Sequence, residues 1–97
     1  MSRTYISGPI SGMPNLNRAA FDEKARELVR LGRDVVNPLQ NGVPPEAEWH
    51  EHMRVDIKLL LECRRIHLLP GWTNSKGARL EWWIAKQLGM EIEGAER

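Results

Sequence analysis

Short apolar runs typical of β-strands alternate along this chain with longer stretches of helical periodicity, and this alternation restricts the fold more than any other feature. Each of the first three runs ends at a residue that interrupts regular structure, Gly8, Pro38 or Pro70. The fourth run follows Gly89. Strands are therefore expected at residues 4–7, 34–37, 65–69 and 90–93.

Three stretches between these runs carry apolar residues at the three- and four-residue spacings of amphipathic helices. The first helix is expected from about residue 17 to 31, before Gly32, which is suited to end a helix. The second is expected to begin at Pro45, and the third to be capped by Ser75 and to end near residue 88. The apolar positions that define the three helices are Phe21, Ala25, Leu28 and Val29; Trp49, Met53, Ile57 and Leu60; and Ala78, Ile84, Ala85 and Leu88.

Strands that alternate with helices predict a parallel sheet covered by helices on both faces. Right-handed crossovers then give an α/β three-layer sandwich with a short parallel sheet, of the flavodoxin or Rossmann type, expected as a single domain over residues 1–97. In folds of this type, ligands bind beyond the carboxyl ends of the strands. The loops at those ends are residues 8–15, 38–44 and 70–74, so the chemistry is expected there.

The composition limits the partners and the surroundings of the protein. A net charge of +1 provides no strong field to attract nucleic acid or an anionic membrane, and the opening residues lack a secretory signal. The single cysteine, Cys63, excludes an internal disulfide framework, and no apolar stretch reaches the length of a membrane span. We therefore expect a cytoplasmic protein without membrane or nucleic acid partners. Its small core favours a homodimer or a larger homo-oligomer.

Glu81 is the residue whose position is hardest to explain by folding alone. It lies three residues from both Ala78 and Ile84, so it falls on the face of the third helix that is turned toward the sheet. An inward carboxylate loses hydration unless it is paired or protonated. The capping-box position relative to Ser75 is occupied by Ala78 and not by an acid. Two interpretations remain for Glu81, a salt bridge and a catalytic role.

Asp56 has the same property on the second helix, because it lies three residues after Met53 and four before Leu60. A local salt bridge to Arg54 or Lys58 is the alternative explanation. Two inward acids near the same strand ends match the needs of glycosyl transfer, in which one group acts as nucleophile and another handles a proton.

The start of the third helix, Ser75-Lys76-Gly77, offers a hydroxyl, an ammonium group and the unpaired N–H groups of a helix N-terminus. This combination suits a phosphate or carboxylate, and a simple N-cap is the alternative interpretation. Gly8, at the end of the first strand, leaves the backbone open to a ligand. The sequence therefore contains two candidate anion-binding segments at the expected ligand edge.

The histidines do not predict a metal site, and neither a metal nor another cofactor is expected. His50 and His52 diverge because they are two residues apart on a helix, and His67 is expected to be a packed or surface residue. Trp72, in the loop after the third strand, is interpreted either as a ring that stacks on a base or as part of the loop packing. Trp49 is expected in the core or in an interface.

Residues 75–81, together with residues 5–9 and the pair Asp56-Ile57, resemble the nucleoside deoxyribosyltransferase superfamily. The chain also looks like small bacterial and phage members of this group, of the DUF4406 type, near the deoxynucleoside 5′-monophosphate N-glycosidase branch. The likeness runs from residue 5 to about residue 92. One departure is Arg64, where relatives often carry an aspartate after the cysteine.

The resemblance implies a role for each matching residue. Glu81 matches the nucleophile that forms a covalent glycosyl-enzyme intermediate, and Asp56 matches the acid that orients the sugar and handles the proton. Tyr5 matches a pocket residue close to the nucleophile. Ser75 matches a serine that touches the 5′-phosphate in the hydrolase branch, which implies a monophosphate substrate. The expected substrate-binding residues are Ser7, Gly8, Pro9, Ser11, Trp72, Ser75 and Gly77.

The resemblance thus implies cleavage or transfer of the N-glycosidic bond of a nucleoside 5′-monophosphate. It also implies a homo-oligomer, because relatives form dimers or larger assemblies, some of which complete the active site with a neighbouring subunit. Two other functions stay open at this point. One is a non-catalytic nucleotide-binding module, and the other is a glycohydrolase that acts on NAD.

Overall fold

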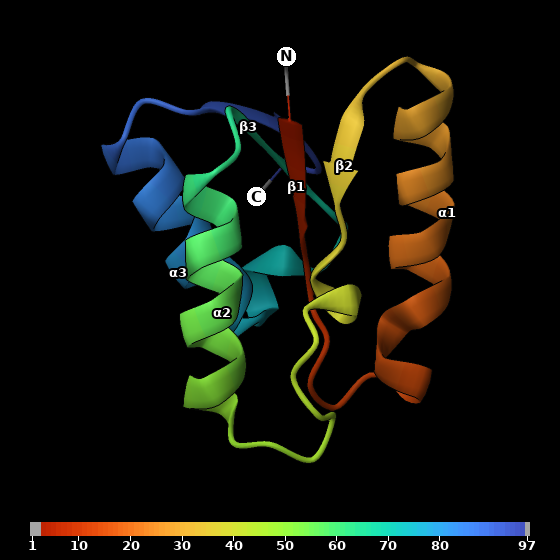
Figure 1. The fold of residues 1–97 in the computed structure, drawn as a ribbon, viewed down its shortest axis with the longest axis vertical. Helices are drawn as coiled ribbons and strands as arrows, with labels where there is room; N and C mark the ends of the chain where they lie inside the picture. The colour runs from red at the N-terminus through yellow and green to blue at the C-terminus, as the bar shows by residue number, and fades with distance from the viewer. Residues whose placement is uncertain (1–2, 97) are drawn as a thin grey trace.

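The strands of this protein form one parallel sheet at the centre of the fold, in the order β2-β1-β3-β4 (Figure 1). The computed structural model describes residues 3–96. Within them the strands are β1 (Arg3–Ser7), β2 (Asp34–Val36), β3 (Arg65–Leu68) and β4 (Glu91–Gly94). The predicted positions of the strands are confirmed to within one residue at each end.

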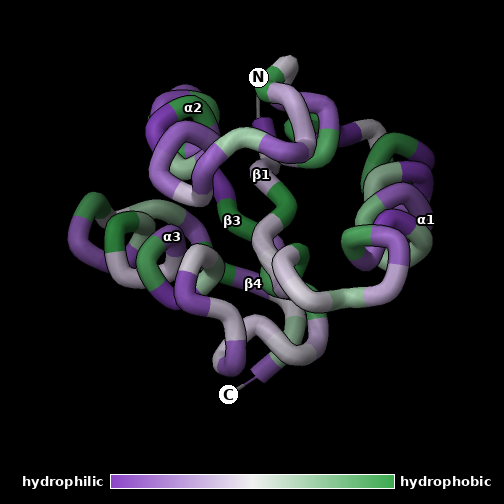
Figure 2. The backbone as a smooth tube through the Cα atoms, turned by 90° about the horizontal axis from the view of Figure 1, so that it is seen from below, coloured by the Kyte–Doolittle hydropathy of each residue, from purple (hydrophilic) through white to green (hydrophobic). Residues whose placement is uncertain are grey.

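The helices lie on both faces of the sheet, which confirms the predicted three-layer α/β fold. They are α1 (Arg18–Arg30), α2 (Trp49–Leu61) and α3 (Lys76–Gln87). Figure 2, which looks at the molecule from below, shows α1 on one side of the strands and α2 with α3 on the other. Three short 3-10 helices, η1 (Pro14–Asn17), η2 (Pro38–Gln40) and η3 (Trp72–Asn74), follow the carboxyl ends of β1, β2 and β3.

The direction in which the chain winds across the sheet reverses between β1 and β3. The chain passes from β1 through α1 to the neighbouring strand β2, and then returns through α2 to β3 on the other side of β1. Open α/β sheets bind ligands where such a reversal leaves a crevice at the carboxyl ends of the strands. The fold therefore places the expected ligand site between the ends of β1 and β3.

Strand β1 supplies residues to both halves of the core because successive side chains point to opposite faces of a sheet. Tyr5 belongs to the cluster under α2 and α3, which includes Leu60 and Ala85. Ile6 belongs to the cluster under α1, which includes Phe21. Ser7 shares the face of Tyr5, and both side chains are fully buried.

The predicted start of the second helix at Pro45 is wrong. Residues 45–47 form a turn in which the N–H of Ala47 donates to the carbonyl of Pro44 over 3.0 Å. The helix begins at Trp49 instead, and the carboxylate of Glu51 accepts the backbone N–H of Glu48 at 2.8 Å. This acidic cap satisfies a free backbone donor at the first turn of the helix and so favours a start at Trp49.

The third helix begins as predicted, since the hydroxyl of Ser75 accepts the N–H of Ala78 at 3.2 Å. It ends before Gly89, whose φ of 71° is easily adopted only by glycine among common residues. None of the helices in residues 3–96 combines the length and the apolar character that crossing a membrane requires.

Candidate active site

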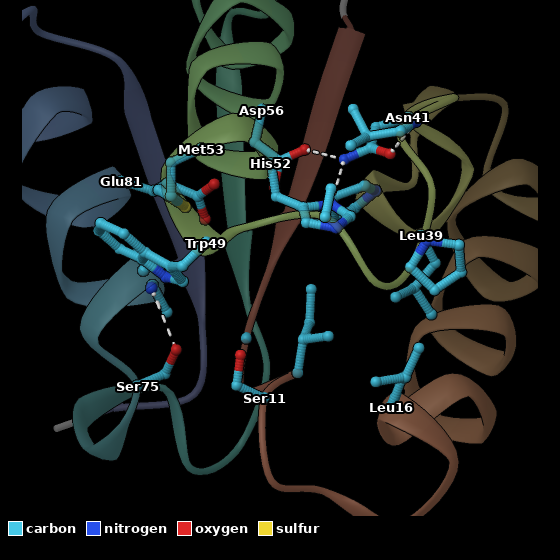
Figure 3. A pocket seen from close by; sticks show the side chains of 18 of the residues that line it. Ser11, Leu16, Leu39, Asn41, Trp49, His52, Met53, Asp56, Ser75 and Glu81 are labelled. Carbon is cyan, nitrogen blue, oxygen red and sulfur yellow. Dashed lines mark hydrogen bonds between the residues drawn. The ribbon is translucent and has the colours of Figure 1, made fainter.

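A cavity of about 210 Å³ opens at the carboxyl end of β1, beside the point where the winding of the sheet reverses. Its wall is formed by residues from five parts of the chain: the end of β1 with the loop after it, the start of α1, the loop after β2, α2, and the first half of α3. Figure 3 shows Glu81, Trp49 and Ser75 on one side of this cavity and Asn41 and Leu39 on the other. The cavity thus lies where the sequence placed the chemistry.

Glu81 reaches the cavity from α3, and only 5% of the residue is exposed. The hydroxyl of Tyr5 donates to Oε2 of Glu81 at 2.6 Å, and the hydroxyl of Ser7 donates to Oε1 at 2.7 Å. Tyr5 and Ser7 serve the same carboxylate because they lie two residues apart on one strand and so share a face. One donor on each oxygen fixes the plane of the carboxylate in the cavity wall.

Both donors to Glu81 are neutral hydroxyl groups, and burial has the largest effect on the protonation of this acid. Burial raises the pKa of Glu81 to about 7, against the opposing effect of the hydrogen bonds from Tyr5 and Ser7 and with a smaller upward contribution from Asp56. Within residues 3–96 no cation forms an ion pair with this carboxylate. Burial also raises the pKa of Tyr5 well above its usual value, so that hydroxyl stays protonated and keeps donating. Glu81 is therefore an acid that changes its charge close to neutral pH.

Asp56 reaches the same cavity from α2 and is also only 5% exposed. The side-chain amide nitrogen of Asn41 donates to Oδ1 of Asp56 at 2.8 Å. Burial raises the pKa of Asp56, while the hydrogen bond from Asn41 acts in the opposite direction. Neither Arg54 nor Lys58 forms a salt bridge with Asp56 in residues 3–96, so the simpler explanation of this inward acid does not hold.

The start of α3 forms another part of the wall through Ser75 and Gly77. A Cβ on Gly77 would lie 3.1 Å from the sulfur of Met53, so a glycine lets α2 and α3 approach closely here. The ammonium group of Lys76 lies 4.1 Å from the ring centre of Trp49 and is thus held at the aromatic ring. The first turn of α3 brings the positive end of a helix to the cavity, as the sequence suggested.

Gly8 lines the cavity, although its glycine identity has a different cause from the one proposed. A Cβ at this position would lie 2.8 Å from Cβ of Leu69, closer than side-chain atoms pack. Residue 8 must therefore be small because the side chain of Leu69, just after β3, packs against it. Access to the backbone by a ligand is a consequence of that packing.

The structure brings seven of the predicted site residues together at the cavity wall and leaves three outside it. Those at the wall are Tyr5, Gly8, Ser11, Asp56, Ser75, Gly77 and Glu81. Ser7 is fully buried and contacts the cavity only through Glu81. Pro9 does not line the cavity and lies beside Gly71.

Of the two interpretations of Trp72, base stacking and packing, the structure supports packing, so Trp72 does not belong with the substrate-binding residues at the cavity wall. Trp72 is 2% exposed, its ring nitrogen donates to the carbonyl of Ala95 at 3.0 Å, and its ring centre lies 5.5 Å from that of Trp82. The side chain therefore fills the core beside α3 and takes no part in the cavity wall. Trp49, which was expected in the core or in an interface, lines the cavity instead.

Three polar residues of the wall were not predicted from the sequence: Arg18, Asn41 and His52. His52 lies four residues before Asp56, so helical spacing contained a signal for it. Asn41 lies in the loop after β2, one of the three loops expected to carry the chemistry. Arg18 gave no signal, because it reaches the cavity only through the left-handed turn at residues 15–17 that precedes α1.

His67 lies outside the cavity, where its Nδ1 is 2.6 Å from Oε2 of Glu93. In the described part of the chain, no group of three or more histidine, cysteine, aspartate or glutamate side chains is placed to hold a metal ion. The polar groups of the cavity wall include the two buried acids, the start of α3 and the three residues that were not predicted.

Comparisons with known proteins agree with this architecture. The family model described as "Domain of unknown function (DUF4406)" matches residues 2–93. A solved structure, "2-desoxiribosyltransferase from Leishmania mexicana", is similar to this chain with a TM-score of 0.70 and 22% sequence identity. The similarity covers 97% of this chain and 63% of that protein, so the chain spans less than two thirds of its length. No curated protein sequence matches the chain. The structural likeness shows a shared fold.

Proposed function

We propose that this chain, which belongs to the family described as a domain of unknown function (DUF4406), cleaves or exchanges the N-glycosidic bond of a nucleoside 5′-monophosphate, with Glu81 as the nucleophile. The observation that carries the proposal is the state of the Glu81 carboxylate. It is buried, it is held by two neutral hydroxyl groups, and its pKa is about 7. The fold shared with a protein named as a deoxyribosyltransferase supports the same chemistry.

The environment of Glu81 suits a nucleophile better than a structural acid. An oxygen paired with a guanidinium group would be strongly held and would attack slowly, whereas the hydroxyl groups of Tyr5 and Ser7 orient the carboxylate without neutralising it. An oxygen of Glu81 forms a bond to the anomeric carbon while the bond from that carbon to the base nitrogen breaks. The electron pair of the broken bond leaves with the base. Water, or a second base, then releases the sugar from Glu81.

The second acid has a different task in this proposal. Asp56 keeps one oxygen on the amide of Asn41 and lines the same cavity as Glu81. Its raised pKa lets it exchange a proton more readily at neutral pH than an ordinary aspartate. We assign Asp56 to orienting a sugar hydroxyl and handling a proton.

The start of α3 supports a phosphate on the substrate. The oxygen of Ser75 already accepts the N–H of Ala78, so its own hydrogen is left to donate to a ligand. Gly77 lies in the first turn of α3, where backbone N–H groups have no partner within the helix and can bind an anion. Arg18 contributes a positive charge to the wall and forms no ion pair within residues 3–96. These groups favour a monophosphate over an unphosphorylated nucleoside.

The test is release of free base from the four common deoxynucleoside 5′-monophosphates and from the matching nucleosides, followed by chromatography. We expect release, with a higher kcat/KM for the monophosphates than for the nucleosides. In a Glu81→Gln variant, release should fall on the order of 1,000-fold or more while the nucleotide still binds. Glu91→Gln is the control, because the side chain of Glu91 is 59% exposed on β4, does not line the cavity and should leave the rate of release unchanged.

Each contradictory result has a definite meaning. Release that survives in Glu81→Gln would remove Glu81 as the nucleophile. Binding of the whole panel without release of base would identify a nucleotide-binding module instead of an enzyme. Release of nicotinamide from NAD, with none from the monophosphates, would move the activity to the larger nucleotide.

A further inference from the structure

The side chain of Asn41 stands between two titratable residues of the cavity, and its orientation is fixed by the backbone. The side-chain oxygen of Asn41 accepts the N–H of Val43 at 2.9 Å. The side-chain nitrogen must then point the other way, where it donates to Asp56 at 2.8 Å. The two ends of the amide are thus distinguished by their partners, because a backbone N–H can only donate.

The remaining hydrogen of the same amide nitrogen faces the ring of His52. The nitrogen of Asn41 lies 3.3 Å from Nδ1 of His52. An amide nitrogen donates and does not accept, so Nδ1 has to accept and cannot carry a proton. The ring proton therefore sits on Nε2, and His52 is held as the neutral Nε2–H tautomer. In a charged imidazolium, Nδ1 of His52 would also carry a hydrogen, so two donors, this N–H and that of Asn41, would point at each other.

The other ring nitrogen of His52 is left for a ligand. His52 lines the cavity, and no residue of the described chain forms a hydrogen bond with its Nε2. It lies one helical turn before Asp56, so the two side chains share a face of α2. In Figure 3 the ring of His52 lies between Glu81 and Asn41, across the cavity from Ser75.

From this geometry we infer that His52 donates a hydrogen bond from Nε2 to the departing base, and that Asn41 is the positioning residue that keeps the proton on that nitrogen. The inference rests on the proposed function. The anion-binding groups of α3 take one end of the substrate, and His52 lies across the cavity from them, on the side left for the base. The substrate class is then a nucleotide whose base has a ring nitrogen or carbonyl oxygen as acceptor near the glycosidic bond.

The hydrogen bond acts when the bond to the base breaks. As the anomeric carbon binds Glu81, the electron pair of the old bond moves onto the base and spreads to its acceptor atoms. The Nε2–H of His52 stabilises this negative charge without giving up its proton, because Nδ1 stays unprotonated beside Asn41. The base then takes a proton from water.

The kinetic test compares two replacements of His52. His52→Phe keeps a flat ring but removes the donor, and it should lower kcat for base release about tenfold with little change in KM. His52→Gln places an amide N–H near the position of Nε2 and should restore most of the rate. His50→Phe is the control, since His50 is exposed on the same helix and does not line the cavity. A full rate in His52→Phe would overturn the inference.

Substrates without the acceptor atom identify what His52 touches. We would use 2′-deoxyadenosine 5′-monophosphate and its 3-deaza and 7-deaza analogues, each of which lacks one ring nitrogen. With the analogue that lacks the contacted atom, the normal protein should turn over more slowly and His52→Phe should cause no further loss. An equal loss from His52→Phe on the parent and on both analogues would show a structural role and overturn the inference.

Nuclear magnetic resonance of the ¹⁵N-labelled protein tests the tautomer without requiring turnover. The free protein should show His52 with a protonated Nε2 and an unprotonated Nδ1, and Asn41→Ala should convert this into a mixture of forms. A protonated Nδ1, or an unchanged ring in Asn41→Ala, would overturn the role of Asn41. If nucleotides bind but no base is released, the proposed function fails. The contact of His52 with the base can still be measured, as a change of the Nε2 resonance on nucleotide binding that is lost with one deaza analogue.

Discussion

Glu81 is buried and Glu93 is partly buried, and the partners of the two carboxylates differ in charge. Glu81 has the hydroxyl groups of Tyr5 and Ser7 as its partners. Glu93, on β4, forms ion pairs with Arg33 and Arg65 and lies 2.6 Å from Nδ1 of His67. Within residues 3–96, Glu81 has only neutral donors, whereas Glu93 is surrounded by groups that carry or can carry positive charge.

The difference appears in the protonation of the two acids. Burial raises the pKa of Glu81 to about 7 in spite of its two hydrogen bonds. Burial by itself would also raise the pKa of Glu93. The interactions with Arg33 and His67, their hydrogen bonds first, outweigh burial, so the pKa of Glu93 is lowered. Glu93 holds β4 to the rest of the sheet through its ion pairs, whereas Glu81 is buried against hydroxyl groups at some cost in stability.

The largest effect expected from this comparison is a pH-dependent loss of stability caused by Glu81. Its pKa is raised from 4.5 to about 7 in the folded protein, so between these values the folded state holds a proton that the unfolded state has released. Stability should therefore fall by about 3 kcal/mol as the pH rises through this window. Urea unfolding of the normal protein and Glu81→Gln from pH 4 to 8 isolates this contribution as the difference between them. A difference that does not change with pH would contradict the raised pKa.

Glu93→Gln is expected to have the next largest effect, and the pH dependence should have the opposite sign. The ionised Glu93 stabilises the fold, so its loss should cost about 2 kcal/mol at neutral pH. The cost should disappear at acid pH, as the pH falls through the lowered pKa of Glu93 and the normal protein loses the same charge. Urea unfolding measures both results. Glu91→Gln is the matched control, because the side chain of Glu91 is 59% exposed in its pair with Arg65 and should matter little.

The smallest effect concerns the hydroxyl groups around Glu81. Both hydrogen bonds lower the pKa of this acid, so Tyr5→Phe and Ser7→Ala should each raise it further, by about one pH unit. The titration of the Glu81 carboxyl carbon, followed by ¹³C resonance, gives the value directly. If base is released, the pH at half-maximal rate should move upward by the same amount. A downward shift in either variant would mean that the two hydroxyl groups favour the neutral acid.

Much of this fold was predictable because it depends on local patterns. Strand and helix positions follow from the periodicity of apolar residues and from the residues that interrupt it, which act over a few neighbouring positions. The inward placement of Glu81 and Asp56 also followed from spacing, since a helix face is fixed by its 3.6-residue period. Even the pairing of Tyr5 with Ser7 on one face was contained in the two-residue period of β1.

The composition of the cavity was not predictable in the same way. Trp49 and Trp72 are both tryptophans near a strand end or a helix start, and only the packing of α2 and α3 places the first at the wall and the second in the core. The contact between Asn41 and His52 joins a loop to a helix and depends on how the turn at residues 45–47 directs the chain into α2.

The sequence by itself therefore determined the α/β sandwich, the edge of the sheet that carries the cavity, and the two acids that face it. The tertiary structure alone decided which aromatic ring and which polar groups complete the wall, and that the donors to Glu81 are neutral. The physical reason is the distance along the chain over which each property is set. The direction of a side chain within a helix or strand is set by backbone geometry over a few neighbouring residues. The partner of a buried charge is set by the packing of elements that lie far apart in the chain, as Tyr5 and Glu81 do.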